Sequence, residues 1–179
     1  GLLELIDAIK LLLDRGIKVK LRMINSEYPA PESSSLVQQA RERIKIYAIE
    51  NDIELISDFL SDEECLQELS KADLIVFPYQ ETGESASGAV RYGLSAHRPV
   101  AVTPLAIFDD VSEAVYKFSG CTINDIANGI ETIMQEIKDD SSYARKMQEK
   151  SDQWREAHQY SKIGYKLNNI LHSLLQNNK

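Results

Sequence analysis

The sequence has few cysteines and histidines, and it has no cluster of basic residues. Its 179 residues include two cysteines, Cys65 and Cys121, and three histidines. Two distant cysteines do not make a disulfide framework, and no Cys or His has the spacing of metal ligands. We therefore expect two reduced thiols, no metal site and a cytoplasmic location.

The chain also lacks the features of a nucleic-acid-binding or membrane-spanning protein. Its formal net charge is −8 and it has no run of Lys or Arg, which argues against DNA or RNA as a partner. No apolar stretch is long enough to cross a bilayer, and no secretory signal is recognisable. The last helical pattern carries only Lys162 and Lys166 as basic residues on its polar side, so peripheral membrane contact is a minor alternative.

What the chain does contain is an alternation of strand and helix patterns, with 43% hydrophobic residues. This alternation predicts an α/β fold, a Rossmann-like doubly wound parallel sheet. We expect a single domain over 1–179, in which about 139–179 form a helical C-terminal extension. Helices are expected before the first strand, between successive strands as far as the fourth, and at 123–137, 141–159 and 161–176. The second helix is expected to be capped by Ser34 or Ser35. The expected strands are 18–25, 53–57, 72–78, 99–103 and 115–118.

Ligands of such sheets bind beyond the carboxyl ends of the strands, and there the segment Tyr79–Gly88 carries the most chemistry. The small residues Ser85–Gly88 open a helix and leave backbone amides accessible to a phosphate. The alternative is a tight turn whose small residues serve packing only. Glu81 and Glu84 either stabilise the helix start or accept hydrogen bonds from a polyol, since a carboxylate can hold two hydroxyls. A phosphate on the amides and a sugar on a carboxylate would together describe a nucleotide sugar.

The stretch ETGESASGAVRYGLSAHRPVAVT, residues 81–103, resembles the donor-site segment of retaining glycosyltransferases of family 4. The resemblance continues through GLLELIDAIKLLLDRGIKVKLRMI, ISDFLSDEECLQELSKADLIVFPY and DIANGIETIMQEIKDDSSYARKM, and so covers nearly the whole chain. It implies the GT-B fold of two Rossmann-like domains. This chain would be the C-terminal, donor-binding domain, and the N-terminal acceptor domain would lie outside it.

Carried over position by position, Glu84 matches the first glutamate of the family's signature, which contacts hydroxyls of the donor hexose. We take Glu84 as the catalytic candidate. Phe59 and Leu60 match the stretch that holds the nucleotide base, although Phe59 could equally be a core residue. The donor-binding residues that the resemblance implies are Phe59, Leu60, Gly83, Glu84, Ser85, Ala86, Ser87, Gly88 and Tyr92.

Two positions depart from the family's pattern. Tyr92 stands where the second glutamate binds the ribose hydroxyls, and a phenol cannot hold two hydroxyls as a carboxylate does. Ribose recognition is therefore expected to be weaker or to be done differently. His97 stands where the family usually has glycine, and we interpret it as a surface or packing residue.

The resemblance implies transfer of a hexose from a nucleoside diphosphate sugar to a hydroxyl acceptor with retention, as in polysaccharide biosynthesis. The donor is a substrate, and no further cofactor is expected. In the family, an Arg and Lys pair that neutralises the diphosphate precedes the point where this chain begins, so we expect the chain alone to be inactive. The alternatives are a non-catalytic nucleotide-sugar-binding or scaffold module, and a GT-B-like epimerase.

Overall fold

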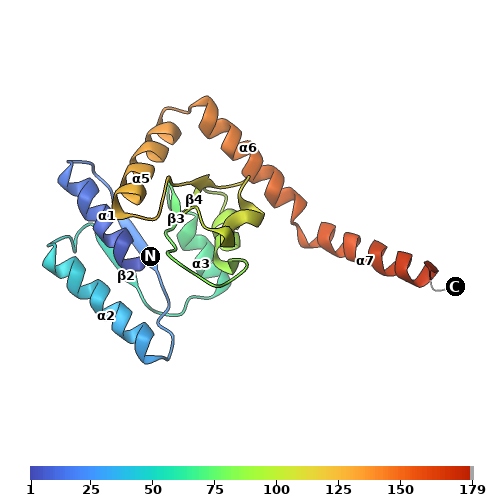
Figure 1. Cartoon of the computed structure of the whole chain (residues 1–179), viewed down its shortest axis with the longest axis horizontal. Helices are drawn as coiled ribbons and strands as arrows, with labels where there is room; N and C mark the ends of the chain where they lie inside the picture. Colours follow the sequence, from blue (N-terminus) through green and yellow to red (C-terminus); the bar gives the residue numbers. More distant parts are fainter. Residues whose placement is uncertain (178–179) are drawn as a thin grey trace.

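The computed structural model describes residues 1–177 and has the alternating α/β order expected from the sequence (Figure 1). Every strand is followed along the chain by a helix before the next strand or the C-terminal helices begin. The elements are α1 (Leu2–Asp14), β1 (Leu21–Ile24), α2 (Pro31–Ile46), β2 (Ile53–Ile56), α3 (Asp62–Leu69), β3 (Ile75–Phe77), α4 (Gly88–Ser95), β4 (Val100–Val102), the 3-10 helix η1 (Ala106–Val111), β5 (Tyr116–Lys117), α5 (Ile123–Lys138), α6 (Ser142–Ala157) and α7 (Tyr160–Asn177).

The strands form two parallel ladders. β1 pairs with β2, with Leu21 opposite Ile53, and β3–β4–β5 form the other ladder, with Ile75 opposite Val100. All pairings are parallel, as the helical connections require. Within each ladder the carboxyl ends of the strands therefore lie at one edge. The loops before α2 and α3 follow β1 and β2, and the loop before α4 follows β3.

Helices cover both faces of the strands, so the expected doubly wound architecture is confirmed. Along β4, Ala101 belongs to one hydrophobic cluster, whereas Val100 and Val102 belong to the other. Successive residues of a strand point to opposite faces, which places the two clusters on opposite sides of the sheet. The first cluster contains residues of α1, α2 and α5, and the second contains residues of α4 and η1 with side chains of α3 packed against it.

The start of α2 differs from the prediction. The helix begins at Pro31, with Ala30 as an N-cap that makes no side-chain hydrogen bond, so a cap at Ser34 or Ser35 was wrong. Proline lacks only an N–H that is unpaired in the first helical turn anyway, and its φ suits that position. The expected strand over 18–25 is also shorter, because only residues of β1 pair with β2.

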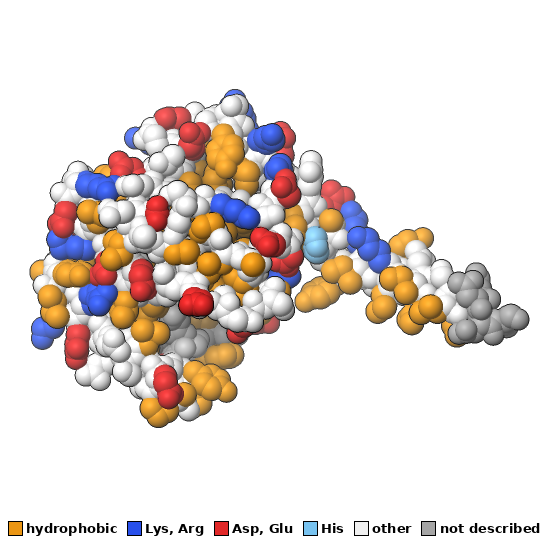
Figure 2. Space-filling model, viewed as in Figure 1, with side chains coloured by type: hydrophobic (Ala, Val, Ile, Leu, Met, Phe, Trp, Pro, Cys, Tyr) orange, Lys and Arg blue, Asp and Glu red, His pale blue; other side chains and the backbone are white. Residues whose placement is uncertain are grey.

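The last two helices behave differently from each other. α6 spans both sides of the domain, since Met147 belongs to the first cluster while Trp154 packs against the second. α7 projects away from the body (Figure 1), and its apolar side chains are visible along the projection (Figure 2). The apolar stripe of α7 does not pack on this domain. Its side chains are exposed at Ile163, Leu167, Ile170, Leu171 and Leu174.

Candidate functional site

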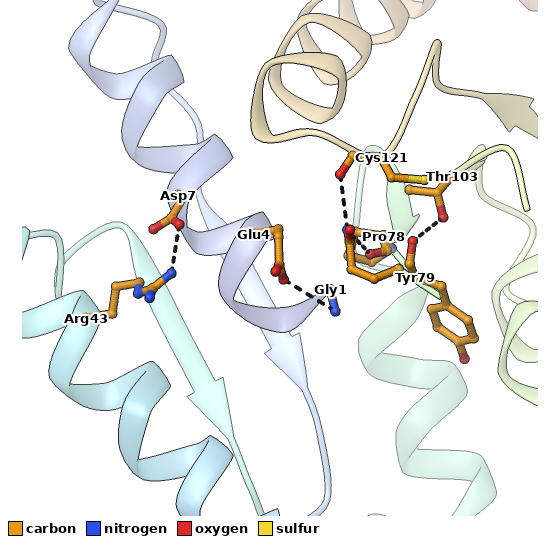
Figure 3. Close-up of polar contacts among 9 residues, drawn as sticks. Gly1, Glu4, Asp7, Arg43, Pro78, Tyr79, Thr103 and Cys121 are labelled. Carbon is orange, nitrogen blue, oxygen red and sulfur yellow. Dashed lines mark hydrogen bonds and ion pairs between the residues drawn. The ribbon is translucent and has the colours of Figure 1, made fainter. Parts of the chain in front are cut away.

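The N-termini of two helices meet at the carboxyl end of β3. Figure 3 shows Gly1, the N-cap of α1, beside Pro78 and Tyr79, which follow β3 directly. A Cβ added at Gly1 would lie 1.7 Å from the carbonyl oxygen of Pro78, so the approach requires glycine. α4 begins a few residues later at Gly88. The positive ends of two helix dipoles therefore face one edge of the sheet, which favours an anion there.

The beginning of the loop after β3 is held by two partly buried hydrogen bonds (Figure 3). The hydroxyl of Thr103, which is fully buried, donates to the carbonyl oxygen of Tyr79 at 2.6 Å. The side-chain amide of Gln80 donates to the carbonyl oxygen of Cys121 at 3.2 Å. These contacts fix the chain just before it reaches the predicted donor-binding residues.

The end of the loop is held at Ser87. Its side chain is 2% exposed, and its Oγ caps α4 by accepting a hydrogen bond from the backbone N–H of Val90 at 3.3 Å. The Tyr79 hydroxyl lies 3.3 Å from the same Oγ, and Arg91 donates to the Ser87 carbonyl at 2.5 Å. Ser87 is thus a cap, and the ligand-facing groups that it leaves free are the N–H groups of the first turn of α4.

Between these anchors, the predicted site residues face open space. Gly83, Glu84, Ser85 and Ala86 are exposed. A Cβ built at Gly83 or at Gly88 would meet no atom within 4 Å. The alternative that these small residues serve packing only is therefore wrong for the two glycines. Open space adjoins the loop at Gly83 and the first turn of α4 at Gly88.

Glu84 is exposed in the middle of this loop. Its backbone N–H donates to Thr82 Oγ1 at 3.2 Å, which orders the loop locally. Within residues 1–177, the carboxylate makes neither a hydrogen bond nor an ion pair. Both of its oxygens are therefore available as acceptors for hydroxyl groups.

The close approach of α4 to β3 depends on Gly93. A Cβ at this position would lie 2.8 Å from the Phe77 ring and 3.3 Å from Val100 Cγ2. Gly93 therefore lets the helix lie close to the sheet. Ser95, another small residue of α4, is exposed and does not contribute to this contact.

Tyr92 is already engaged by another residue. Its hydroxyl donates a hydrogen bond of 2.7 Å to Asp62 Oδ1 at the start of α3, and both side chains are exposed. This hydrogen bond is the main cause of a raised pKa of Tyr92. The pairing was not expected, because 30 residues separate the two in the sequence.

Phe59 is a surface residue, which excludes the alternative that it belongs to the core. Its side chain is 87% exposed, whereas Leu60 is half-buried. A hydrogen bond of 3.2 Å from Ser26 Oγ to the Asp58 carbonyl oxygen ties this loop to the loop after β1. An uncovered aromatic ring beside the carboxyl end of β2 is suited to stacking on a planar ligand.

The loop after β1 follows the carboxyl end of a strand, where ligands of such sheets bind, and it forms an open cavity. It has a volume of about 440 Å³ and is lined by Glu27, Tyr28, Pro29, Ala30, Pro31 and Ser34. Tyr28 is 72% exposed and was missed as a candidate. Its proximity in sequence to the end of a predicted strand was the only signal that could have identified it.

His97 is exposed, as expected, and has a further property. It follows the C-cap of α4 with φ of 58°, in the left-handed region. This conformation favours glycine at the residue after a helix, which gives a physical reason for glycine at the matching position of the family.

The charge around the loop is mainly negative. Arg91, the one cation of α4, forms an ion pair with Asp110 of η1. Among the residues that the structure describes, no group of three or more Cys, His, Asp and Glu side chains could hold a metal ion. A bound diphosphate would therefore depend on the helix N-termini of this chain and on cations from elsewhere.

The structure describes no helix in residues 1–177 that is long and apolar enough to cross a membrane. No protein-family model matches the sequence, and no curated protein matches it.

The fold is similar to those of solved glycosyltransferase structures. A glycosyltransferase from Rickettsia africae matches 99% of this chain with a TM-score of 0.77 and 15% identity, over 45% of its own length. Sucrose-phosphate synthase from Thermosynechococcus elongatus matches 96% with a TM-score of 0.72 and 11% identity, over 42% of its length. The Anabaena protein Alr3699/HepE, solved in complex with UDP, matches 93% with a TM-score of 0.67 and 13% identity, over 52% of its length. The chain thus spans about half the length of these structures, and its fold is the one that a half of each glycosyltransferase adopts.

Proposed function

We propose that this chain is the donor-binding half of a retaining glycosyltransferase, which transfers a hexose from a nucleoside diphosphate sugar to a hydroxyl acceptor. The observation that carries the proposal is the loop after β3. It is anchored at Tyr79 and Ser87, it opens onto the first turn of α4, and it presents the unpaired carboxylate of Glu84. Solved structures of the same fold, with UDP and with UDP-glucose in the Anabaena protein, support it.

The N–H groups at the start of α4 and the Glu84 carboxylate would bind different parts of a nucleotide sugar. The N–H groups at the start of α4 and the dipoles of α1 and α4 would bind the diphosphate, whose negative charge increases when the bond to the sugar breaks. Glu84 would accept hydrogen bonds from the sugar hydroxyls and so orient the hexose. The exposed ring of Phe59 would stack on the base.

The rest of the reaction would need groups from outside this chain. Residues 1–179 would form one donor-binding domain, and a second domain would supply the acceptor site and the cations that neutralise the diphosphate. We therefore expect no transfer by the isolated chain. A cytoplasmic location agrees with the two unpaired cysteines, Cys65 and Cys121.

The second candidate is a non-catalytic nucleotide-sugar-binding module. Tyr92 favours it, because its hydroxyl is used by Asp62 instead of being free for a ligand. Both candidates bind a nucleotide sugar, and transfer by the full-length protein distinguishes them. A GT-B-like epimerase would instead release the sugar-nucleotide with an altered hexose and need no acceptor.

The test is the substitution Glu84→Gln in the full-length protein that carries this chain. Titrations would use UDP, ADP and GDP and the corresponding nucleoside diphosphate glucoses. Glu84→Gln should weaken binding of the best sugar nucleotide by about tenfold, the effect of one charge-assisted hydrogen bond, and leave binding of the free nucleotide unchanged. Glu81→Gln, which removes an equally exposed carboxylate from the same loop, is the matched control.

The proposal fails if none of these six ligands binds. It also fails if Glu84→Gln and Glu81→Gln change sugar-nucleotide binding equally, because the effect would then be one of general charge.

A further inference from the structure

The contact between Asp62 and Tyr92 joins the first residue of α3 to the second turn of α4. It is a directed contact, because the phenol donates its only proton to Oδ1 of the carboxylate. Within residues 1–177, Asp62 Oδ2 has no hydrogen-bond partner. The pair therefore presents acceptor groups to solvent and no free donor.

The location of this pair follows from helix geometry. Tyr92 lies four residues after Gly88, so it is on the same face of α4, about 6 Å further along the axis. Asp62 lies three residues after the exposed ring of Phe59. The pair thus connects the helix that begins at the open N–H groups with the loop that carries the uncovered aromatic ring.

In a nucleoside diphosphate, the ribose lies between the diphosphate and the base. A site that holds the diphosphate at Gly88 and the base at Phe59 would bring the ribose between these two places. The ribose offers two hydroxyl donors, and these require acceptors. The Asp62–Tyr92 pair is an acceptor group that links the helix beginning at Gly88 to the segment that follows Phe59.

We propose that Asp62, held in orientation by Tyr92, accepts the hydrogen bonds of the ribose hydroxyls. This inference rests on the proposed donor-binding function. Position 92 on α4 is a tyrosine and offers no carboxylate, and we assign the ribose instead to the carboxylate of Asp62 on α3. Asp62 is the residue that contacts the ligand, and Tyr92 is a positioning residue. A free carboxylate at the end of a helix would sample several orientations, and the phenol restricts it to one.

The test is Asp62→Asn in the full-length protein. Asparagine keeps a carbonyl oxygen that can accept the Tyr92 hydrogen bond, and it replaces the free acceptor by an NH₂ donor. The probes are UDP, ADP and GDP together with their 2′-deoxy and 3′-deoxy forms. The wild-type protein should prefer the ribonucleotide to a deoxy form by about tenfold, and Asp62→Asn should abolish this preference.

The matched control is Glu63→Gln, which makes the same change of charge on the next residue of α3. It should leave the preference for ribose unchanged, because Glu63 has no contact with Tyr92. Tyr92→Phe removes the orienting hydrogen bond and keeps the ring, and it should reduce the preference to an intermediate value. Circular dichroism of each variant establishes that the helices are retained.

The outcomes separate this inference from the proposed function. If no nucleotide binds the wild-type protein, both are overturned. If nucleotides bind and Asp62→Asn keeps the wild-type preference for ribose, the assignment of Asp62 is overturned while donor binding stands. If Glu63→Gln also abolished the preference for ribose, the assignment of Asp62 would be overturned, because loss of any negative charge at the start of α3 would then have the same effect.

Discussion

Thr103 and Tyr79 are joined by a hydrogen bond that links the end of β4 to the loop after β3. The Thr103 hydroxyl is fully buried and donates to the Tyr79 carbonyl oxygen at 2.6 Å. The Tyr79 ring packs against Phe108, with ring centroids 5.1 Å apart. The beginning of the candidate donor loop is therefore determined by the interior of the domain.

Replacement of this hydroxyl tests how far the anchor matters. Thr103→Val keeps the side-chain shape and leaves a buried carbonyl without its partner, so the free energy of unfolding should fall by about 1–3 kcal/mol. Urea denaturation measures the change. The matched control is Thr132→Val on the surface of α5, which should change stability by less than about 0.5 kcal/mol. Equal effects of both substitutions would contradict an anchoring role.

Two glycines of α4 should respond in opposite ways to alanine. Gly93→Ala places a methyl group 2.8 Å from the Phe77 ring and should destabilise the domain by about 1–3 kcal/mol. The methyl group of Gly88→Ala meets no atom, so stability should be unchanged or slightly higher.

The methyl group of Gly88→Ala should weaken nucleotide binding, because it covers the open side of the first turn of α4. Thermal unfolding and titration with UDP, ADP and GDP measure both effects, and unimpaired binding by Gly88→Ala would contradict the predicted location of the phosphates.

The left-handed conformation of His97 predicts a stabilising substitution. His97→Gly relieves the cost of φ at 58° and should raise the free energy of unfolding by about 1 kcal/mol. Ala48→Gly, at φ of 52° after α2, should act in the same direction. Ser95→Gly, within α4, should instead lower stability by about 0.5–1 kcal/mol. If His97→Gly lowered the free energy of unfolding, contacts of the His97 side chain would stabilise the fold by more than its left-handed conformation costs.

The capping box at the start of α5 predicts a dependence of stability on acid. Hydrogen bonds from Thr122 and Ser119 hold the pKa of Asp125 below its ordinary value of 3.8. Because the folded protein favours the ionised form, this stabilisation is complete above pH 3.8 and is lost as the pH falls through the lowered pKa. Asp125→Asn should therefore destabilise the protein at neutral pH and differ less from wild type at about pH 3.

The control for this experiment is Asp73→Asn. Asp73 is exposed and has no hydrogen bond or ion pair within the described part of the chain. Its substitution should leave stability nearly unchanged at both pH values. If Asp125→Asn had the same effect at both pH values, the box would act through the geometry of the side chain and not through its charge.

The order of the elements was predictable because their patterns are local. Periodicity and turn residues identify the helices and strands, and the apolar run before Pro78 contains β3, although β3 lies at the end of its ladder and not at its centre. The start of α2 was missed because Pro31 was taken as a loop residue, although proline is favourable in the first helical turn. The 3-10 helix η1 was also missed, since a short helix has too few residues to establish a period.

The site was predictable only where it is contiguous in sequence. The loop after β3 could be recognised from its acids and small residues, and the structure adds that Gly83 and Gly88 face open space. The exposure of Phe59 and the pairing of Asp62 with Tyr92 depend on how separate elements pack. A single sequence carries no local pattern for either, so both required coordinates.

The anchoring of the loop at Tyr79 and Ser87, with an exposed segment between them, has a consequence for how specificity can change. Residues 81–86 contribute little to the interior, so substitutions there should have small effects on folding. A library that varies this segment while Thr103, Tyr79 and Ser87 are kept would therefore sample new sugar preferences on an intact scaffold. The residues that hold the fold and the residues exposed for a ligand are therefore separate parts of one loop.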